Sequence, residues 1–276
     1  MFQLHDSQKI VASDPTRFRV LCCGRRWGKT TLAIDQMKAR LTIPNSRVCY
    51  VAPTYQQARD IAWEALRKEL HQVGKINESR LEIELVNGSK LVLRGWESIE
   101  TLRGQKFDFI VLDEIAMMRN FWLSWQEVIR PTLTDTKGEA IFISTPKGFN
   151  HFYDLYNFQT RDIDFKSFHF TTYDNPHIPR DEIDKAKKEL TEDRFAQEYL
   201  ADFRKSEGLV YKEFNRFRHV FKKGPKEETI INIFGGVDFG YTNPCGVITI
   251  KKDKWANYWV TDEWYKTGNT DKRIWI

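Results

Sequence analysis

The chain has 276 residues, of which 41% are hydrophobic and 14% aromatic, so it holds enough apolar side chains for a packed core. This composition excludes a mainly disordered protein. Its apolar runs stay well short of the ~18 residues that a membrane-spanning helix needs, and residues 1–10 are too polar for a signal peptide. We therefore expect a soluble protein of about two domains, or one large one, with no membrane partner, whose four cysteines stay reduced.

The formal net charge of +5 is concentrated in one stretch. Residues 201–226 contain eight basic and three acidic side chains, an excess that equals the net charge of the whole chain. Aromatic residues lie between these charges, which is typical of a segment that contacts a polyanion. A solvated connector with a few apolar anchors explains the same pattern, so both interpretations stay open.

Along the chain, short apolar strands alternate with helical patterns. Strands are predicted at residues 19–23, 48–52, 109–112 and 140–144, and helices at residues 29–39, 55–70 and 121–129. This alternation indicates an α/β fold whose mostly parallel sheet is covered on both faces. Asn87-Gly88, between the apolar residues 81–85 and 91–93, predicts a type I′ hairpin turn and therefore an antiparallel insertion or edge in that sheet.

The second half of the chain changes character. Residues 165–170 predict one more strand, and residues 180–203 predict a long helix before the composition shifts near residue 207. A three-stranded antiparallel meander is predicted after that, at residues 230–239, 246–251 and 255–264. We expect a first domain over residues 1–207, a basic linker over residues 208–229 and a partial second domain over residues 230–276.

The first predicted strand runs into a loop and a helix start that are typical of a phosphate-binding site. Backbone N–H groups at such a helix start surround the phosphates, a lysine reaches the terminal ones, and a threonine hydroxyl ligates Mg²⁺. A Gly-Lys-Thr triplet also occurs by chance, but the strand–loop–helix context favours the functional interpretation. The predicted nucleotide-binding residues are Cys23 (where the first glycine is usual), Gly24, Arg25, Arg26, Trp27, Gly28, Lys29, Thr30 and Thr31, with Lys29 also catalytic.

An acidic pair follows the apolar strand at residues 109–112. Ligands in open α/β sheets bind where the strands end, so Asp113 is expected to hold Mg²⁺ together with Thr30. Glu114 is expected to orient and deprotonate the attacking water. A solvent-exposed acidic strand end is the alternative, and the phosphate loop upstream favours the catalytic interpretation.

Two hydroxyl residues end the next predicted strand. Ser144 and Thr145, followed by a proline, would lie beside the γ-phosphate and sense whether it is present. Taken alone, this Ser-Thr-Pro sequence is simply a turn.

These motifs, in this order, resemble the large subunit of the tailed-bacteriophage terminases, the motors that package viral DNA. The arginine-containing loop at residues 23–30 is similar to the family's variant of the phosphate loop, and Ser144-Thr145-Pro146 to its coupling motif. Val51-Ala-Pro-Thr-Tyr55 is similar to its motor motif. Residues 172–176 and 195–203 are like stretches that the family carries before its linker. The resemblance implies a P-loop NTPase fold of the RecA-like, ASCE type.

The resemblance also implies roles for three further side chains. Gln8 matches the family's adenine-reading glutamine. Arg103 matches its arginine finger, which reaches the ATP of a neighbouring subunit and so implies a ring-forming homo-oligomer. Arg25 would act in the same way within its own subunit. A turn arginine ahead of a strand is the alternative for Arg103.

Residues 236–240 resemble the opening of the family's RNase H-like nuclease domain. Such sites hold two Mg²⁺ or Mn²⁺ ions between several carboxylates, and Asp238 would be the first ligand. The family's other ligands lie beyond this segment, and Asp262 and Glu263 do not occupy their places. We therefore expect the nuclease domain to be incomplete here, with endonuclease activity only in a longer chain.

For the whole protein, the resemblance implies ATP and Mg²⁺ as cofactors of the motor. The implied partners are double-stranded DNA, the terminase small subunit and the portal protein, in the host cell cytoplasm and transiently at the procapsid portal. A helicase-like DNA-dependent ATPase is an alternative with a similar core, although no second complete motor domain follows. A non-catalytic nucleotide- or DNA-binding module is another, but it predicts a damaged phosphate loop, whereas Lys29, Thr30, Asp113 and Glu114 are all present.

Overall fold

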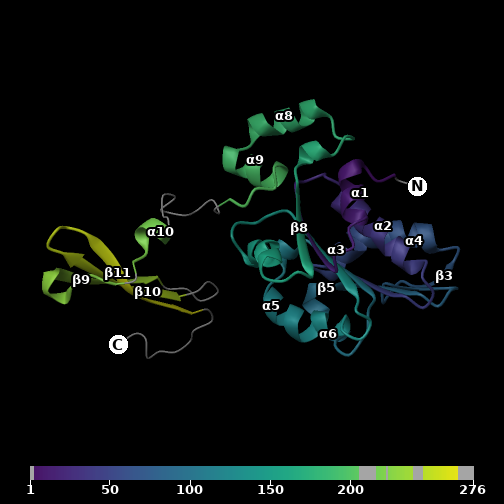
Figure 1. The fold of residues 1–276 in the computed structure, drawn as a ribbon, viewed down its shortest axis with the longest axis horizontal. Helices are drawn as coiled ribbons and strands as arrows, with labels where there is room; N and C mark the ends of the chain where they lie inside the picture. Colours follow the sequence, from purple (N-terminus) through teal and green to yellow (C-terminus); the bar gives the residue numbers. More distant parts are fainter. Residues whose placement is uncertain (1–2, 205–215, 222, 239–244, 267–276) are drawn as a thin grey trace. The chain divides into compact units, whose positions relative to one another are not determined.

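The computed structural model describes residues 3–204, 216–221, 223–238 and 245–266. The chain divides into two units, Met1–Leu209 and Val210–Ile276 (Figure 1), and each is described by itself. Residues 208–215 of the predicted linker lie outside the described residues. Within the described part of the chain, every helix is too short or too polar to cross a membrane.

A mostly parallel sheet of eight strands forms the centre of the first unit (Figure 1). The order is β3-β4-β5-β2-β6-β7-β1-β8, and the neighbours from β5 to β8 are parallel, whereas β3 and β4 pair antiparallel at one edge. The predicted fold class and the predicted antiparallel edge are confirmed, with β3 added beyond the prediction. The strands are β1 (Phe18–Cys23), β2 (Arg47–Ala52), β3 (Gly74–Asn77), β4 (Glu82–Leu85), β5 (Lys90–Gly95), β6 (Phe109–Asp113), β7 (Glu139–Ser144) and β8 (Phe165–Phe170).

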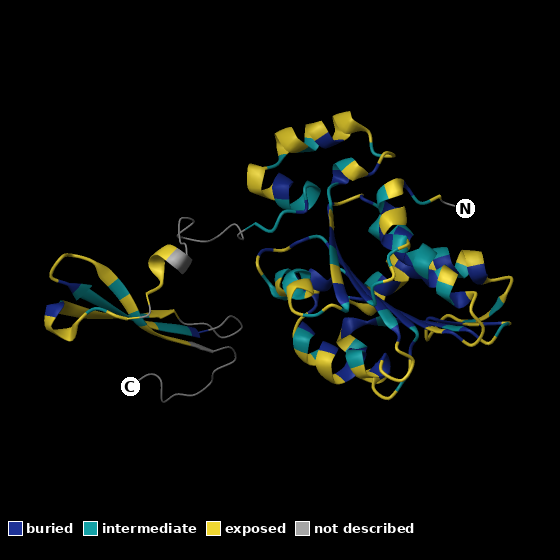
Figure 2. Cartoon of the chain, viewed as in Figure 1, coloured by how far each residue is buried: buried dark blue, intermediate teal, exposed yellow. Residues whose placement is uncertain are grey.

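The central strands pack against apolar side chains on both faces of the sheet. Every residue of β1 and β6 is buried, and neighbouring residues along a strand enter different cores. Leu21 and Val111 belong to one core, whereas Val20 and Leu112 belong to the other. Figure 2 shows these strands as a buried centre, with exposed residues on the helices around them. Burial on both faces explains why the strands read as continuous apolar runs.

Helices cover both faces of the sheet, and the helices predicted at residues 29–39, 55–70 and 121–129 are confirmed. Two of these segments contain a turn of π-helix, at Arg59–Trp63 and at Trp125–Ile129. Short 3₁₀ turns include Trp96–Leu102 and Ile115–Met117. The α-helices up to β8 are α1 (Asp6–Ala12), α2 (Lys29–Leu41), α3 (Tyr55–Ala58), α4 (Glu64–Leu70), α5 (Phe121–Ser124), α6 (Arg130–Thr132) and α7 (His151–Tyr156).

The long helix predicted over residues 180–203 is wrong, because the structure has two shorter helices there. These are α8 (Arg180–Glu189) and α9 (Glu192–Tyr199). The backbone is extended at Leu190, and the Thr191 side chain accepts a hydrogen bond from the backbone N–H of Arg194. A threonine followed by acidic residues is a helix-start signal, which the apolar periodicity of the segment concealed.

The turn at Asn87-Gly88 is also not the predicted type I′, which requires positive φ at both residues. Gly88 has a φ of 84°, but Asn87 is not among the positive-φ residues. The Asn87 side chain explains the difference, since it accepts a hydrogen bond from the Ser89 backbone N–H (3.0 Å) and donates one to the Leu41 carbonyl (2.9 Å). The hairpin end is therefore fastened to the end of α2.

The second unit contains a three-stranded antiparallel sheet in the order β11-β10-β9. The strands β9 (Ile230–Asp238), β10 (Cys245–Asp253) and β11 (Tyr258–Lys266) form the predicted meander, and α10 (Arg216–His219) precedes them. Asp253 shapes the turn between β10 and β11, accepting hydrogen bonds from the backbone N–H groups of Trp255 and Asn257 (both 2.9 Å) and from Nε1 of Trp259 (2.9 Å).

One ion-pair cluster ties the antiparallel edge of the first unit together. Glu82 on β4 is 8% exposed and contacts Arg94 and Lys90 of β5, with 3.1 Å between Oε2 and the Lys90 Nζ. Burial acts to raise the pKa of Glu82, but hydrogen bonds from Arg94 and Lys90 outweigh it, so the pKa lies below its usual value.

We expect Glu82→Gln to lower the free energy of unfolding by about 1–3 kcal/mol at pH 7, because it weakens charged hydrogen bonds at a buried position. A carboxyl whose pKa is lowered by folding stabilises the fold above its unfolded pKa and loses that contribution as pH falls through the folded pKa. Urea unfolding should therefore show a larger difference between the two proteins at pH 7 than at pH 3. Glu84→Gln, exposed on the same strand, is the control; equal effects of both variants would contradict the prediction.

Candidate nucleotide-binding site

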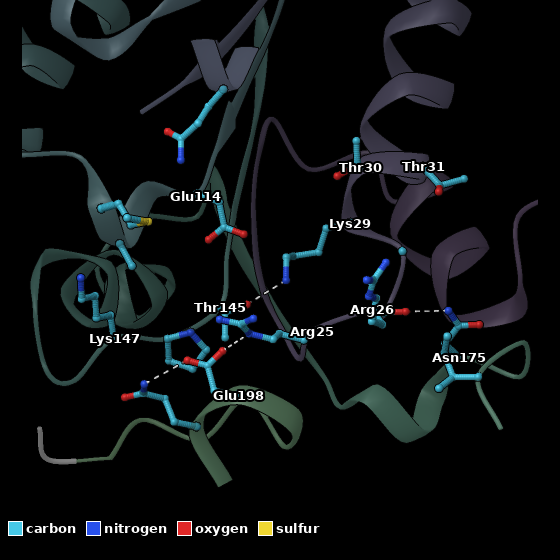
Figure 3. Close-up of a pocket in the computed structure, with 17 residues that line it drawn as sticks. Arg25, Arg26, Lys29, Thr30, Thr31, Glu114, Thr145, Lys147, Asn175 and Glu198 are labelled. Atoms are coloured by element: carbon cyan, nitrogen blue, oxygen red, sulfur yellow. Dashed lines mark hydrogen bonds and ion pairs between the residues drawn. The ribbon is translucent and has the colours of Figure 1, made fainter. Parts of the chain in front are cut away.

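The loop between β1 and α2 borders a cavity at the C-terminal ends of the parallel strands (Figure 3). The cavity has a volume of about 890 Å³. Four cationic and two acidic side chains line it together with polar and apolar ones: Arg25, Arg26, Gly28, Lys29, Thr30, Thr31, Gln57, Glu114, Ala116, Met117, Thr145, Pro146, Lys147, Asn175, Ile178, Gln197 and Glu198. The excess of positive charge suits a polyanionic ligand.

The first turn of α2 supplies the anion-binding part of the cavity. The helix begins at Lys29, and its first N–H groups have no acceptor within the helix, which favours negative charge at this end. Lys29 extends from that turn into the cavity (Figure 3) and its Nζ lies 2.8 Å from Oγ1 of Thr145. The same ammonium donates to the carbonyls of Cys23 and Gly24, both at 3.3 Å. These oxygens hold the lysine where a phosphate would meet it.

Segments far along the chain fasten the loop from outside. The backbone N–H groups of Gly24 and Arg25 donate to the carbonyls of Phe170 (2.9 Å) and Glu198 (2.7 Å). Oγ1 of Thr172 donates to the Arg25 carbonyl at 2.7 Å. A Cβ on Gly24 would lie 2.4 Å from the carbonyl oxygen of Tyr199, so only glycine permits this approach.

The N-terminal helix fastens the loop from its other side. Trp27 is fully buried, stacks on Phe170 with ring centroids 4.9 Å apart, and donates from Nε1 to Oγ of Ser7 at 3.1 Å. Nε2 of Gln8 donates to the Gly28 carbonyl at 2.8 Å, while its Oε1 accepts from the His5 backbone N–H at 3.0 Å. Gln8 is 2% exposed and does not line the cavity, so its adenine-reading role stays a prediction.

The acidic pair lies where β6 ends, with its two carboxylates in different environments. Asp113 is 3% exposed and accepts hydrogen bonds from the Tyr50 hydroxyl (2.7 Å) and the Glu114 backbone N–H (3.0 Å). Glu114 has a φ of 53°, an uncommon conformation for a residue with a side chain, and its carboxylate lies inside the cavity near Lys29 (Figure 3). Burial raises the pKa of both carboxyls, and Lys29 opposes this rise.

The two hydroxyl residues at the end of β7 lie next to these groups. Ser144 is fully buried outside the cavity lining, with its Oγ 3.4 Å from Oε2 of Glu114, and it accepts a hydrogen bond from the Ala116 backbone N–H at 3.2 Å. Thr145 lines the cavity and donates from Oγ1 to the Cys23 carbonyl at 3.2 Å. The hydroxyls therefore connect the acidic pair to the loop.

Arg25, Arg103 and Asp238 differ in where they lie relative to this cavity. Arg25 borders the cavity and pairs with Glu198. Arg103 is 54% exposed outside the cavity lining, where its Nε lies 2.9 Å from the Glu100 carboxylate. Asp238 is exposed at the end of β9 in the second unit, and among the described residues no group of three or more His, Cys, Asp or Glu side chains forms a metal cluster.

Sequence reasoning missed several side chains of the cavity. Asn175 and Glu198 fall within the stretches 172–176 and 195–203, which carried a family resemblance without an assigned role. Lys147 follows the predicted Ser-Thr-Pro turn and is an exposed cation of the lining. Their position within or directly after recognised motifs was the available signal.

We expect Glu114→Gln to stabilise the fold at pH 8, because folding removes an ionised carboxylate from water. Since folding raises this pKa, the cost is present above the folded pKa and disappears below the unfolded pKa near ~4.3. In buffer without Mg²⁺ or nucleotide, melting should rise by about 2–4 °C at pH 8, the shift that ~1 kcal/mol produces in a protein of this size, and should not change at pH 4. Exposed Glu84→Gln is the control, and an unchanged or lower melting temperature at pH 8 would contradict the prediction.

Known proteins with similar sequences are terminase large subunits. The family profile described as "Terminase large subunit, T4likevirus-type, N-terminal" matches residues 20–217. The terminase large subunit of Escherichia phage T5 is 33% identical over 270 residues, which cover 92% of this chain and 60% of that protein. That of Thermus virus P23-45 is 29% identical over 239 residues, covering 73% and 49%. The chain thus spans about half to three fifths of the length of these relatives.

Solved structures with a similar fold are also large terminases. The large terminase ATPase domain of Thermus phage P74-26 is similar with a TM-score of 0.65 and 27% identity, covering 74% of this chain and 95% of that domain. The large terminase of the thermophilic bacteriophage D6E has a TM-score of 0.62 at 17% identity, covering 99% of this chain and 72% of that one, which supports the fold. Together with the profile match and the T5 relative, this shows that the chain belongs to the terminase large subunit family.

Proposed function

We propose that this chain is an ATP-hydrolysing motor subunit that drives double-stranded viral DNA into a procapsid. The observation that carries the proposal is the meeting of Lys29, Glu114 and Thr145 in one cavity at the ends of three neighbouring strands, with Asp113 directly behind. The P74-26 relative, named as an ATPase domain, supports it, since it aligns with 74% of this chain.

The residues present fit a Mg²⁺-bound nucleoside triphosphate. Mg²⁺ prefers oxygen ligands, and the Thr30 hydroxyl and the Asp113 carboxylate supply them at adjacent ends of α2 and β6. When bound, the ion would neutralise the negative charge that develops on the phosphates during transfer. The cationic lining and the free N–H groups of α2 supply the rest of the charge match.

The side chains then have separable roles. Lys29 exchanges its contacts with Thr145 and the loop carbonyls for phosphate oxygens. Glu114 accepts a proton from the attacking water, a task helped by the raised pKa of its buried carboxyl. Ser144, close to Glu114 and bonded to the Ala116 N–H, transmits the state of the site to the segment after β6.

Two arginines complete the proposed motor site. Arg103 is placed on the surface, where its ion pairs with Glu100 and Glu127 are weak enough to be given up for the ATP of a neighbouring copy in a ring. Arg25 serves the same subunit's nucleotide from within the loop, in exchange for Glu198.

The remaining roles follow from the family and stay part of this proposal. The partners are double-stranded DNA, the terminase small subunit and the portal protein, met in the host cell cytoplasm at the procapsid. The basic residues near 204–226 contribute a salt-sensitive contact to DNA. Asp238 is assigned to the family's metal-dependent nuclease site, as a ligand of Mg²⁺ or Mn²⁺.

We expect Lys29→Ala and Glu114→Gln to abolish ATP hydrolysis by different routes. Lys29→Ala removes a phosphate contact, so nucleotide binding should weaken with turnover. Glu114→Gln removes the base but keeps the shape, so ATP should still bind while turnover falls by about 10²–10⁴-fold. Nucleotide titration and phosphate release measure both, and wild-type turnover in Glu114→Gln would remove that residue from its role.

We expect ATPase activity to rise with protein concentration, or on addition of DNA and portal, as subunits meet. Arg103→Ala should lose this rise and still bind ATP, since a finger supplied by a neighbour contributes about 10³–10⁵ in rate. Arg161→Ala, another exposed arginine, is the matched control. Activity that depends on neither concentration nor Arg103 would assign this residue a structural role.

A further inference from the structure

The short turn after β6 carries a strained residue that its surroundings must hold in place. Glu114 has φ and ψ of 53° and 46°, the left-handed region that residues with a side chain seldom adopt. Such a conformation persists only where the structure around it enforces it. On one side, Asp113 is fixed by the register of β6 with β7. On the other side, the 3₁₀ turn at Ile115–Met117 has to supply the constraint.

The first residues of α7 hold that turn from outside the cavity. Nε2 of His151 donates a hydrogen bond to the Ile115 carbonyl at 2.7 Å, and it must carry the proton because a carbonyl oxygen only accepts. Nδ2 of Asn150 donates to the Ala116 carbonyl at 2.9 Å. The Ala116 N–H donates to Oγ of Ser144 at 3.2 Å. Side chains of β7 and α7 therefore bond to two consecutive carbonyls and one N–H of the turn.

The two donors on α7 are themselves oriented by other contacts. Oδ1 of Asn150 accepts a hydrogen bond from the Phe152 backbone N–H at 3.0 Å, which caps α7 and fixes which end of the amide meets the turn. The His151 ring stacks on Phe121, with ring centroids 5.4 Å apart and planes 18° apart. Both donors are half-buried, and neither lines the cavity. They can therefore influence a reaction in the cavity only through the turn.

We propose that Asn150 and His151 are positioning residues for the Glu114 carboxylate. By holding the carbonyls of residues 115 and 116, they keep Glu114 in its left-handed conformation, with the carboxylate in the cavity near Lys29 (Figure 3). This inference rests on the proposed function, in which Glu114 accepts a proton from the attacking water. A reacting group displaced by about 1 Å can cost about 10²-fold in rate, so the loss of either donor should slow the chemical step.

Single-turnover ATP hydrolysis by the full chain, with a parallel nucleotide titration, separates the chemical step from binding. His151→Phe keeps an aromatic ring beside Phe121 but removes the donor. Asn150→Asp keeps the acceptor that caps α7 and also removes its donor. Each variant should lower the hydrolysis rate by about 10–10²-fold, and each should bind ATP within about twofold of the wild-type affinity, because the phosphate contacts are unchanged.

A conservative replacement and a matched control show whether the effect comes from the lost donor. The amide of His151→Gln reaches about as far as Nε2 of the ring, so this variant should recover most of the rate that His151→Phe loses. A general loosening of α7 would not be reversed in this way. Asp154→Asn, exposed on the same helix, should leave the rate unchanged. Thermal melting of every variant confirms that it is folded.

The double variant His151→Phe with Glu114→Gln tests whether His151 acts through Glu114. Once the carboxylate is gone, no base is left to position. The double variant should therefore hydrolyse ATP at about the rate of Glu114→Gln alone, which is the non-additive result expected for two residues that act as a unit.

Three outcomes would overturn the inference. Wild-type rates in both His151→Phe and Asn150→Asp, with Glu114→Gln inactive, would leave the proposed function intact and give the two contacts a structural role only. Independent losses that multiply in the double variant would show that His151 does not act through Glu114. Wild-type turnover in Glu114→Gln would instead remove the proposed base, and the positioning role with it.

Discussion

The parallel pairing of β6, β7 and β1 is the constraint on which the site depends. Its register sets Cys22 beside Ser144 and Asp113 beside Ile143, so all three strands end at one edge of the sheet. Because the strands are buried on both faces, a shift by one residue would exchange the side chains of the two cores. The register is therefore fixed by packing, and the loop, the acidic pair and the hydroxyl pair meet although they are distant in sequence.

The sequence predicted the parts of this arrangement that depend on local pattern. Apolar runs located the strands, and the residues that follow them located Lys29, Asp113 and Glu114. What escaped prediction depends on backbone groups, because no side-chain pattern shows that Asn175 bonds to a loop carbonyl or that an amide of the loop bonds to Glu198. The break between α8 and α9 was missed for a related reason, since one capping threonine outweighed a longer apolar periodicity.

Charged side chains are paired differently at the two ends of the parallel strands. Arg19 is buried, and its guanidinium contacts Glu139, which also pairs with Arg40, so this buried cation has a carboxylate partner within the protein. Asp113 is buried and Glu114 is half-buried, close to a single ammonium that also bonds to neutral oxygens. Two carboxylates that share one cation in this way lower the stability of the fold. Such a cost is typical of a functional site.

The fastening of the loop also bears on the order in which the protein folds. Its contacts with α1 join residues about twenty apart, but Thr172 and Asn175 reach it across 147 and 149 residues, and Glu198 across 173. Such non-local contacts form late, because the intervening chain must first be ordered. During synthesis from the N-terminus, the loop sequence is made early, yet its outer supports exist only after residue 198 has left the ribosome. The supports of the loop, like the pairing of β1 with β7 and β8, thus require nearly the whole first unit to have been synthesised.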